Sequence, residues 1–296
     1  MTMRTVLAAI IAVTLLCSTT AHAQSVSRPT FLALQKVQEL SEAEQYEEAK
    51  VALEELLTKV KPNSYDFAIT NQYLAHTSVM LDDSRTARTA LEAALATTEL
   101  PEELRLDMNL FYGTVLIGDE EFELARRALE EWFAAAPRPK PSQIFSLAYA
   151  NYMSDDLERA EHLVARAIGE APQPPESWYQ LYYRVLLELK KFEVAEAVLL
   201  GMLERNPTSR LYWRMLASHH LQLERSSEAL AAIMVAYTGS LIDDTKDLEQ
   251  IVSLYSYIDV PEKGARMLEE WMGEEKLPED AETLKQLGNM GILKST

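Results

Sequence analysis

Small and apolar residues follow a helical period along most of the chain, and the pattern itself repeats. Each repeat has a small residue, an apolar residue four positions later and another three positions after that, so all three lie on one helical face. The small residues are Ala49, Ala87, Ala125, Ala160, Ala195, Ala229 and Gly264, separated by 38, 38, 35, 35, 34 and 35 positions. Such a period predicts an array of helical repeats.

The residues before each small residue predict a first helix that packs against the second. Twelve positions before them stand Val37, Ala75, Gly113, Ala148, Tyr183, Ala217 and Val252. Helices approach closely where side chains are short, so this position is expected to be the crossing point within each hairpin, with Tyr183 as the exception. Pro137, Pro172 and Pro207 follow the small residue by twelve positions in three successive repeats, where they stop the second helix.

The pattern predicts seven helix pairs and one final helix that caps the stack. Two proline-rich joints, at 137–141 and 172–175, are open to interpretation as proline-rich ligands or as interdomain linkers, but the period continues through both, which favours stiff turns. The predicted pairs cover about 30–60, 65–97, 102–136, 142–170, 176–205, 209–238 and 245–273, and the final helix about 279–292.

These repeats resemble the tetratricopeptide repeat family over about 260 residues. The resemblance implies an all-α, right-handed α-solenoid of about seven helix pairs over residues 24–296, and a protein that binds other proteins. A narrower resemblance begins at Pro175, on the segments 175–181 (PESWYQL), 189–192 (LKKF), 211–213 (LYW), 236–237 (AY) and 260–265 (VPEKGA). These segments are similar to periplasmic tetratricopeptide proteins that accompany TonB systems. The similarity implies association with an inner-membrane ExbB–ExbD–TonB complex, which powers uptake of iron chelates.

The N-terminus has the features of a signal peptide. Arg4 precedes an apolar run over 6–16, and Ala21-His22-Ala23 has the small-x-small form that signal peptidase recognises. We expect cleavage after Ala23 and a periplasmic protein, because the run is shorter than the ~20 residues that span a bilayer; a retained anchor is the alternative. Cys17 could be lipidated, but Leu16 stands where a lipobox has a small residue.

The charge of the chain limits its partners. Without residues 1–23 the chain has no cysteine, and its 27 basic and 46 acidic residues give 27 − 46 = −19. Such a surface repels phosphate backbones and anionic lipid, so we expect neither nucleic acid as a partner nor tight membrane insertion after cleavage. A basic protein segment is a better candidate.

No set of residues predicts catalysis, a cofactor or a metal site. His219, His220 and Glu224 include an i, i+4 pair with metal-ligand spacing, but a zinc site needs three or four converging ligands, so we interpret them as helix-surface residues. Three acidic pairs lie at expected turns and are interpreted as helix caps rather than calcium ligands: 82–83, 155–156 and 243–244. Motifs of hydrolases, nucleotide-binding proteins and metalloproteases are absent from the sequence.

An aromatic face on the first helix of the fourth repeat predicts a binding groove. Phe145, Tyr149 and Tyr152 lie on a different face from the apolar residues of that helix, and such a face lines the concave groove in the resembled family. The alternative is that Phe145 and Tyr149 pack between repeats. An apolar centre beside two guanidinium groups suits an extended or helical segment of acidic character. In the same register the other repeats contribute Gln72, His76, Leu110, Thr114, Gln180, Arg184 and Arg214.

Together these features predict a non-enzymatic adaptor that holds part of a cell-envelope protein, most specifically a component of a TonB–ExbB–ExbD apparatus. An adaptor for assembly or secretion of pili or outer-membrane proteins is the alternative, and an enzyme or metal-dependent module is the third hypothesis. Four aromatic residues fall instead on core positions and are expected to be structural: Tyr179, Tyr182, Trp213 and Trp271.

Overall fold

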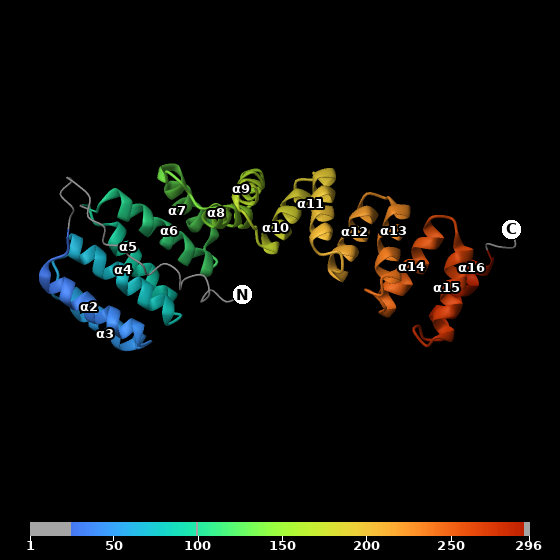
Figure 1. Cartoon of the computed structure of the whole chain (residues 1–296), viewed down its shortest axis with the longest axis horizontal. Helices are drawn as coiled ribbons and strands as arrows, with labels where there is room; N and C mark the ends of the chain where they lie inside the picture. Colours follow the sequence, from blue (N-terminus) through green and yellow to red (C-terminus); the bar gives the residue numbers. More distant parts are fainter. Residues whose placement is uncertain (1–24, 99, 293–296) are drawn as a thin grey trace. The chain divides into compact units, whose positions relative to one another are not determined.

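Helices make up the regular structure of the computed structural model, which describes residues 25–98 and 100–292 and shows no β-strand in these ranges (Figure 1). They form consecutive hairpins followed by a single helix, which confirms the predicted all-α solenoid of tetratricopeptide-like pairs. The predicted signal peptide, residues 1–23, lies outside the described residues. The helices are α2 (Arg28–Glu42), α3 (Tyr46–Leu57), α4 (Tyr65–Met80), α5 (Ser84–Leu95), α6 (Glu102–Gly118), α7 (Phe122–Ala135), α8 (Pro141–Met153), α9 (Leu157–Glu170), α10 (Glu176–Glu188), α11 (Phe192–Arg205), α12 (Arg210–Gln222), α13 (Ser226–Thr238), α14 (Thr245–Tyr257), α15 (Pro261–Gly273) and α16 (Ala281–Ile292).

One turn conformation joins the two helices of every hairpin. Five positions before each small residue, a residue other than glycine has a φ between 57° and 63°, in the left-handed region. The chain reverses there without a longer loop, so the two helices of a pair lie side by side. The residues are Glu44, Asp82, Glu120, Asp155, Lys190, Glu224 and Asp259.

The acidic pairs cap helices, as the sequence predicted. The second residue of each pair accepts a hydrogen bond from a backbone N–H in the first turn of the helix that follows it. Asp83 accepts from Thr86 at 3.1 Å, and Asp244 accepts from Asp247 at 3.1 Å. Asp156 at the start of α9 makes the same contact.

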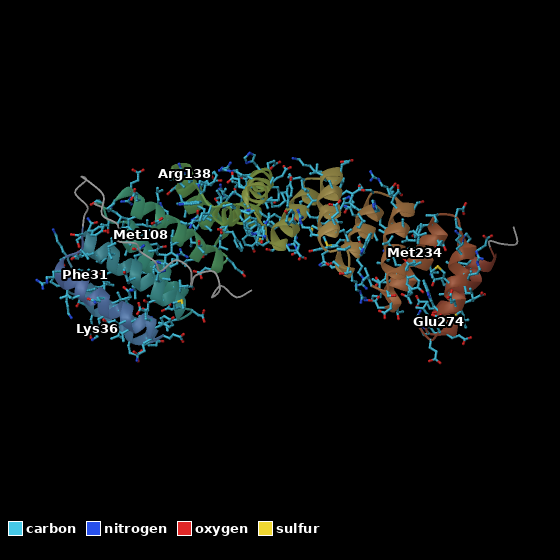
Figure 2. All side chains as sticks on the ribbon, viewed as in Figure 1. Phe31, Lys36, Met108, Arg138, Met234 and Glu274 are labelled. Carbon is cyan, nitrogen blue, oxygen red and sulfur yellow. The ribbon has the colours of Figure 1, made fainter. Side chains whose placement is uncertain are left out.

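The second helix of each pair buries the predicted face. The six alanines of the repeat pattern are fully buried, and so are the apolar residues four positions later, from Leu53 to Leu268. On the first helices, Met108 of α6 is also buried, whereas Phe31 of α2 is 53% exposed (Figure 2). Burial of this periodic face supplies the main stabilisation of the hairpins.

Gly113 marks a close approach between α6 and α7. A Cβ atom at this position would lie 2.5 Å from Cγ of Leu129, which is itself fully buried. The contact confirms the predicted crossing point in this hairpin. Tyr183 occupies the same register in α10 and is buried, with its hydroxyl 3.3 Å from Nδ1 of His219 on α12. Its side chain therefore reaches the next repeat.

The helices belong to two compact units, and the chain passes from the first to the second between Ala171 and Pro172. The first unit contains α2 to α9, and the second contains α10 to α16. The boundary falls at the joint 172–175, for which the sequence left a stiff turn and a linker as alternatives. The second unit has a core that extends from Tyr183 to Met290, the latter on the terminal helix α16. Within the described ranges, no helix has the length and apolarity needed to cross a bilayer.

Candidate partner-binding site

The ten residues predicted to line a groove lie on the first helices of five hairpins. Seven of them belong to the first unit and are half-buried: Gln72, His76, Leu110, Thr114, Phe145, Tyr149 and Tyr152. Three belong to the second unit: Gln180 and Arg184, which are exposed, and Arg214, which is half-buried. Each unit therefore presents its own set of candidate contact residues.

The aromatic residues of α8 are half-buried, so they combine the two predicted alternatives, a groove lining and packing between repeats. Ile144, Leu147 and Ala148 supply the buried face of the helix, each with no exposed surface. The ring of Tyr149 packs edge-on against Phe122 of α7, with centroids 6.0 Å apart and planes at 86°. Tyr149 is half-buried, so this contact leaves part of its surface open to solvent. The helix therefore carries a supported aromatic face beside its core face.

His76 is part of a stacked pair rather than a charged side chain. Its ring lies parallel to that of Phe111 on α6, with centroids 4.1 Å apart and planes at 10°. Burial lowers the pKa of His76 to about 4, so the imidazole is neutral at neutral pH. Phe111 was missed in the sequence, although it follows the predicted residue Leu110 directly. The hydroxyl of Thr114 donates to the carbonyl of Leu110 at 2.9 Å.

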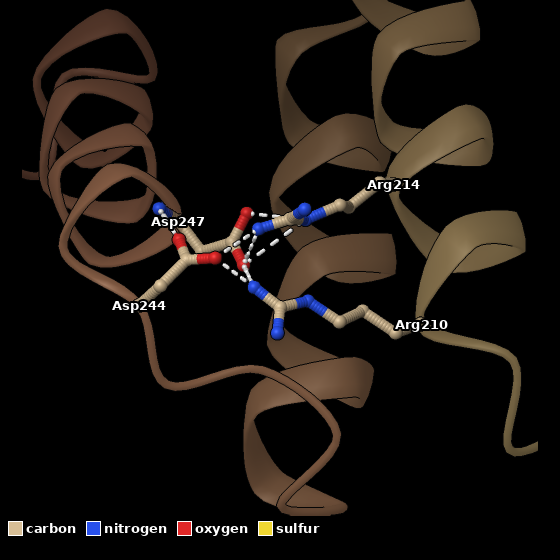
Figure 3. Close-up of polar contacts among 4 residues, drawn as sticks. All are labelled: Arg210, Arg214, Asp244 and Asp247. Carbon is tan, nitrogen blue, oxygen red and sulfur yellow. Dashed lines mark hydrogen bonds and ion pairs between the residues drawn. The ribbon is translucent and has the colours of Figure 1, made fainter.

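Arg214 is held in an ion-pair cluster between α12 and α14. Its Nε donates to Oδ1 of Asp247 at 2.7 Å, and its guanidinium also contacts Asp244 (Figure 3). Arg210, one turn earlier on α12, reaches the same two carboxylates. Asp247 is 3% exposed, so its charge needs these partners. The two positive and two negative charges balance, so the guanidinium of Arg214 is less available to a partner than the sequence predicted.

Arg184 has no such neighbour. It is exposed on α10 and takes part in no ion pair with any residue in the described ranges. Gln180, one turn earlier, donates to the hydroxyl of Tyr212 at 3.4 Å. Arg184 is therefore the open guanidinium of the predicted set.

The histidines at 219 and 220 are buried, so their interpretation as helix-surface residues is wrong. They are 2% and 8% exposed, because they lie ten and nine positions before the small residue, where other repeats bury Val185 and Leu186. Their position relative to the small residue is the feature of the sequence that indicates burial. Burial lowers the pKa of His219, and the carboxylate of Glu196 partly offsets this effect.

Glu196, rather than Glu224, faces the histidine pair. The Nε2 atoms of His219 and His220 each lie 4.0 Å from a carboxylate oxygen of Glu196 on α11, which also pairs with Arg225 at 3.0 Å. Glu224 is the exposed turn residue with positive φ. In the described part of the chain, no three metal-ligating side chains gather in a way that could hold an ion.

The four aromatic residues expected to be structural pack in or against the core of the second unit. Trp271 has no exposed surface, and its Nε1 donates to the hydroxyl of Tyr237 at 2.7 Å. Trp213 donates to the carbonyl of Pro207 at 2.8 Å, and Arg205 lies 4.0 Å above the ring of Tyr179. Tyr182 packs against the same core.

Solved structures place this fold with tetratricopeptide repeat proteins. A tetratricopeptide repeat protein from Parabacteroides merdae has a TM-score of 0.53 and 11% identity over 89% of this chain and 99% of that chain. The C-terminal part of a repeat protein from Cytophaga hutchinsonii has a TM-score of 0.56 and 14% identity over 86% and 98%. A chain of the Naa15/Naa10 structure bound to HypK-THB has a TM-score of 0.54 and 16% identity over 86% and 43%.

Comparison of sequences adds nothing to this placement. No protein-family model matches the chain, and no curated protein matches it in sequence. At the identities found among the solved structures, the likeness establishes the fold alone.

Proposed function

We propose that this protein is a non-enzymatic scaffold that binds a segment of a cell-envelope protein on the first-helix face of its repeats. The observation that carries the proposal is the aromatic face of α8, formed by Phe145, Tyr149 and Tyr152. These side chains are half-buried while three other residues complete the core face of the helix. Partly exposed aromatic side chains supply contact area and are enriched where proteins bind one another.

The polar candidates support binding rather than chemistry. His76 is neutral and stacked, and the guanidinium of Arg214 is paired with two carboxylates. Arg184 is the exposed charge on the same register of the second unit, where it can pair with a carboxylate of an acidic segment.

We propose further that the protein acts in the periplasm as an accessory of a TonB–ExbB–ExbD type system. Support comes from the signal-peptide pattern of residues 1–23 and from the five segments between 175 and 265 that resemble periplasmic relatives. Arg184 lies between the first two of these segments. The structure of a Naa15/Naa10 complex contains a chain of similar fold, bound to HypK-THB, so a chain with this fold can work inside a protein assembly.

Direct binding tests the proposal. The mature chain is titrated against the purified periplasmic domains of TonB and ExbD, and Arg184→Glu is compared with Arg266→Glu, an exposed charge reversal on α15 of the same unit. We expect Arg184→Glu to weaken binding by about threefold to tenfold, with the deficit shrinking as salt rises, and Arg266→Glu to leave it unchanged. Equal effects of the two substitutions would contradict the site. Absence of binding to both domains would contradict the TonB assignment.

A further inference from the structure

The outer faces of the second helices differ between repeats. The positions five and six residues after the small residue are exposed or half-buried in every repeat, and at least one of the two is charged in five repeats. In the fifth and sixth repeats neither is charged: they are Leu200 and Gly201 on α11, and Met234 and Val235 on α13. The charged repeats have Glu54 and Glu55, Glu92, Glu130 and Glu131, Arg166, and Glu269 and Glu270 at these positions.

Three large apolar side chains on these two helices are exposed to solvent. Leu200 and Val194 on α11 are each 44% exposed, and Val235 on α13 is 49% exposed (Met234 beside it is labelled in Figure 2). Because α12 contacts both α11 and α13, the two outer faces belong to successive hairpins of one unit. Single exposed apolar residues are ordinary, whereas several of them on the second helices of successive hairpins are a candidate interaction site. We define the α11–α13 strip as Val194, Ala197, Leu200, Ala231, Met234 and Val235; Met234 is half-buried against the core and the other five are exposed.

Acidic side chains border the strip. Glu193 and Glu204 lie near the two ends of α11, and Glu228 lies in the first turn of α13; all three are exposed. None of them forms an ion pair with a residue in the described ranges. Glu196, by contrast, pairs with Arg225 at 3.0 Å. The border therefore offers unpaired negative charge around an apolar centre.

The apolar strip and its acidic border together indicate which kind of partner can bind there. An amphipathic helix buries an apolar stripe in a complementary apolar surface, and basic residues beside that stripe would meet the glutamates. A second copy of the chain would instead bring acidic borders together on molecules of net charge −18. With 14 residues, α11 is about 21 Å long, which matches a partner helix of about four turns.

We propose that the α11–α13 strip is a second docking surface, for a partner helix whose apolar stripe is flanked by lysine or arginine residues. The strip lies on second helices, so it is separate from the first-helix face on which the proposed function depends. Binding at the strip should therefore be insensitive to Arg184→Glu. This independence allows either proposal to fail without the other.

A synthetic peptide tests the strip directly. The probe is a labelled 18-residue helix with a leucine stripe and flanking lysines, measured by fluorescence anisotropy against the mature chain, and its control has the same leucines with flanking glutamates. We expect Leu200→Glu combined with Val235→Glu to weaken binding of the lysine peptide by about tenfold or more. Val51→Glu is the matched control, since Val51 is 55% exposed on α3 of the other unit, and it should leave binding unchanged.

The direction of the change separates docking from simple charge attraction. The double substitution adds two negative charges, so a peptide held by charge alone would bind the variant more tightly, and that result would overturn the proposal. Equal binding of the lysine-flanked and glutamate-flanked peptides would overturn the charge selectivity. The triple variant Glu193→Gln, Glu204→Gln and Glu228→Gln leaves the apolar strip intact and should weaken binding and flatten its salt dependence.

Sedimentation equilibrium of the unliganded chain tests whether a second copy of the chain binds the strip instead. We expect a single species whose mass does not depend on concentration. A dimer that forms in the wild-type chain and is lost in the Leu200→Glu, Val235→Glu variant would assign the strip to self-association and overturn the proposal. Both substituted side chains are exposed, so the variant should melt close to the wild-type temperature.

Discussion

Gly113→Ala tests the packing of the hairpins most sharply, because two opposing effects can be compared. Alanine favours a helix over glycine by about 0.8–1.0 kcal/mol. Against this, the new Cβ would lie 2.5 Å from Cγ and 2.7 Å from Cδ2 of Leu129. Leu129 has no exposed surface, so its side chain cannot move into solvent, and α6 and α7 must separate. Overpacking of this kind costs about 1–3 kcal/mol, so after the gain in helix propensity we expect a net loss of about 0–2 kcal/mol.

The same substitution elsewhere provides the control. Gly201 lies within α11 and has no atom within 4 Å of the position that a Cβ would occupy. Gly201→Ala should therefore stabilise its unit by up to about 1 kcal/mol, through helix propensity alone. Thermal and urea unfolding followed by circular dichroism measures both variants, and 1 kcal/mol corresponds to about 2–4 °C in a unit of this size. If Gly113→Ala raised the melting temperature as Gly201→Ala does, the assigned close approach would be refuted.

Three further predictions concern individual groups. The pKa of His76 in the folded chain, about 4, is below the unfolded value of 6.5, so the stability that depends on the neutral imidazole is complete above pH 6.5 and is lost as pH falls towards 4. His76→Phe should therefore remove about 1–3 kcal/mol of the loss of stability in acid, whereas replacement of the exposed His162 should not. Asp247→Ala removes the buried acid of the cluster and should destabilise the chain by about 1–3 kcal/mol in urea unfolding, with the exposed neighbour Asp243 as the control; equal effects would contradict the cluster. Intact-mass measurement of exported protein should give a chain that begins at Gln24, and a mass that includes residues 1–23 would contradict export by cleavage.

The fold could be predicted because its determinants are local. A small residue at a regular interval and apolar residues on the same face fix the buried side of each second helix, and acidic residues at turns fix the caps. The hairpin turn conformation could not be predicted, since residues such as Glu44 and Lys190 carry no glycine or asparagine signal for positive φ. There the packing of the two helices imposes the conformation.

The candidate site was less predictable, because it depends on contacts between repeats. The partner of Arg214 is Asp247, 33 residues away, and the partner of His76 is Phe111, 35 residues away. A pattern within one helix cannot show which side chain of the next repeat meets it. The histidines at 219 and 220 were misplaced for a related reason: their polarity suggested the surface, while their register is one that adjacent repeats bury. Sequence reasoning places the faces of this chain, and the contacts between repeats decide which polar groups remain open to a partner.

Site-specific photocrosslinking in living cells tests the central claim, that the first-helix face holds an envelope protein. A photoreactive phenylalanine derivative is introduced at position 149 on α8, at 184 on α10, or at 266 on α15 as the control. We expect positions 149 and 184 to give adducts that mass spectrometry assigns to envelope proteins, and position 266 to give none. Adducts from position 266 alone, or none from 149 and 184, would contradict the account.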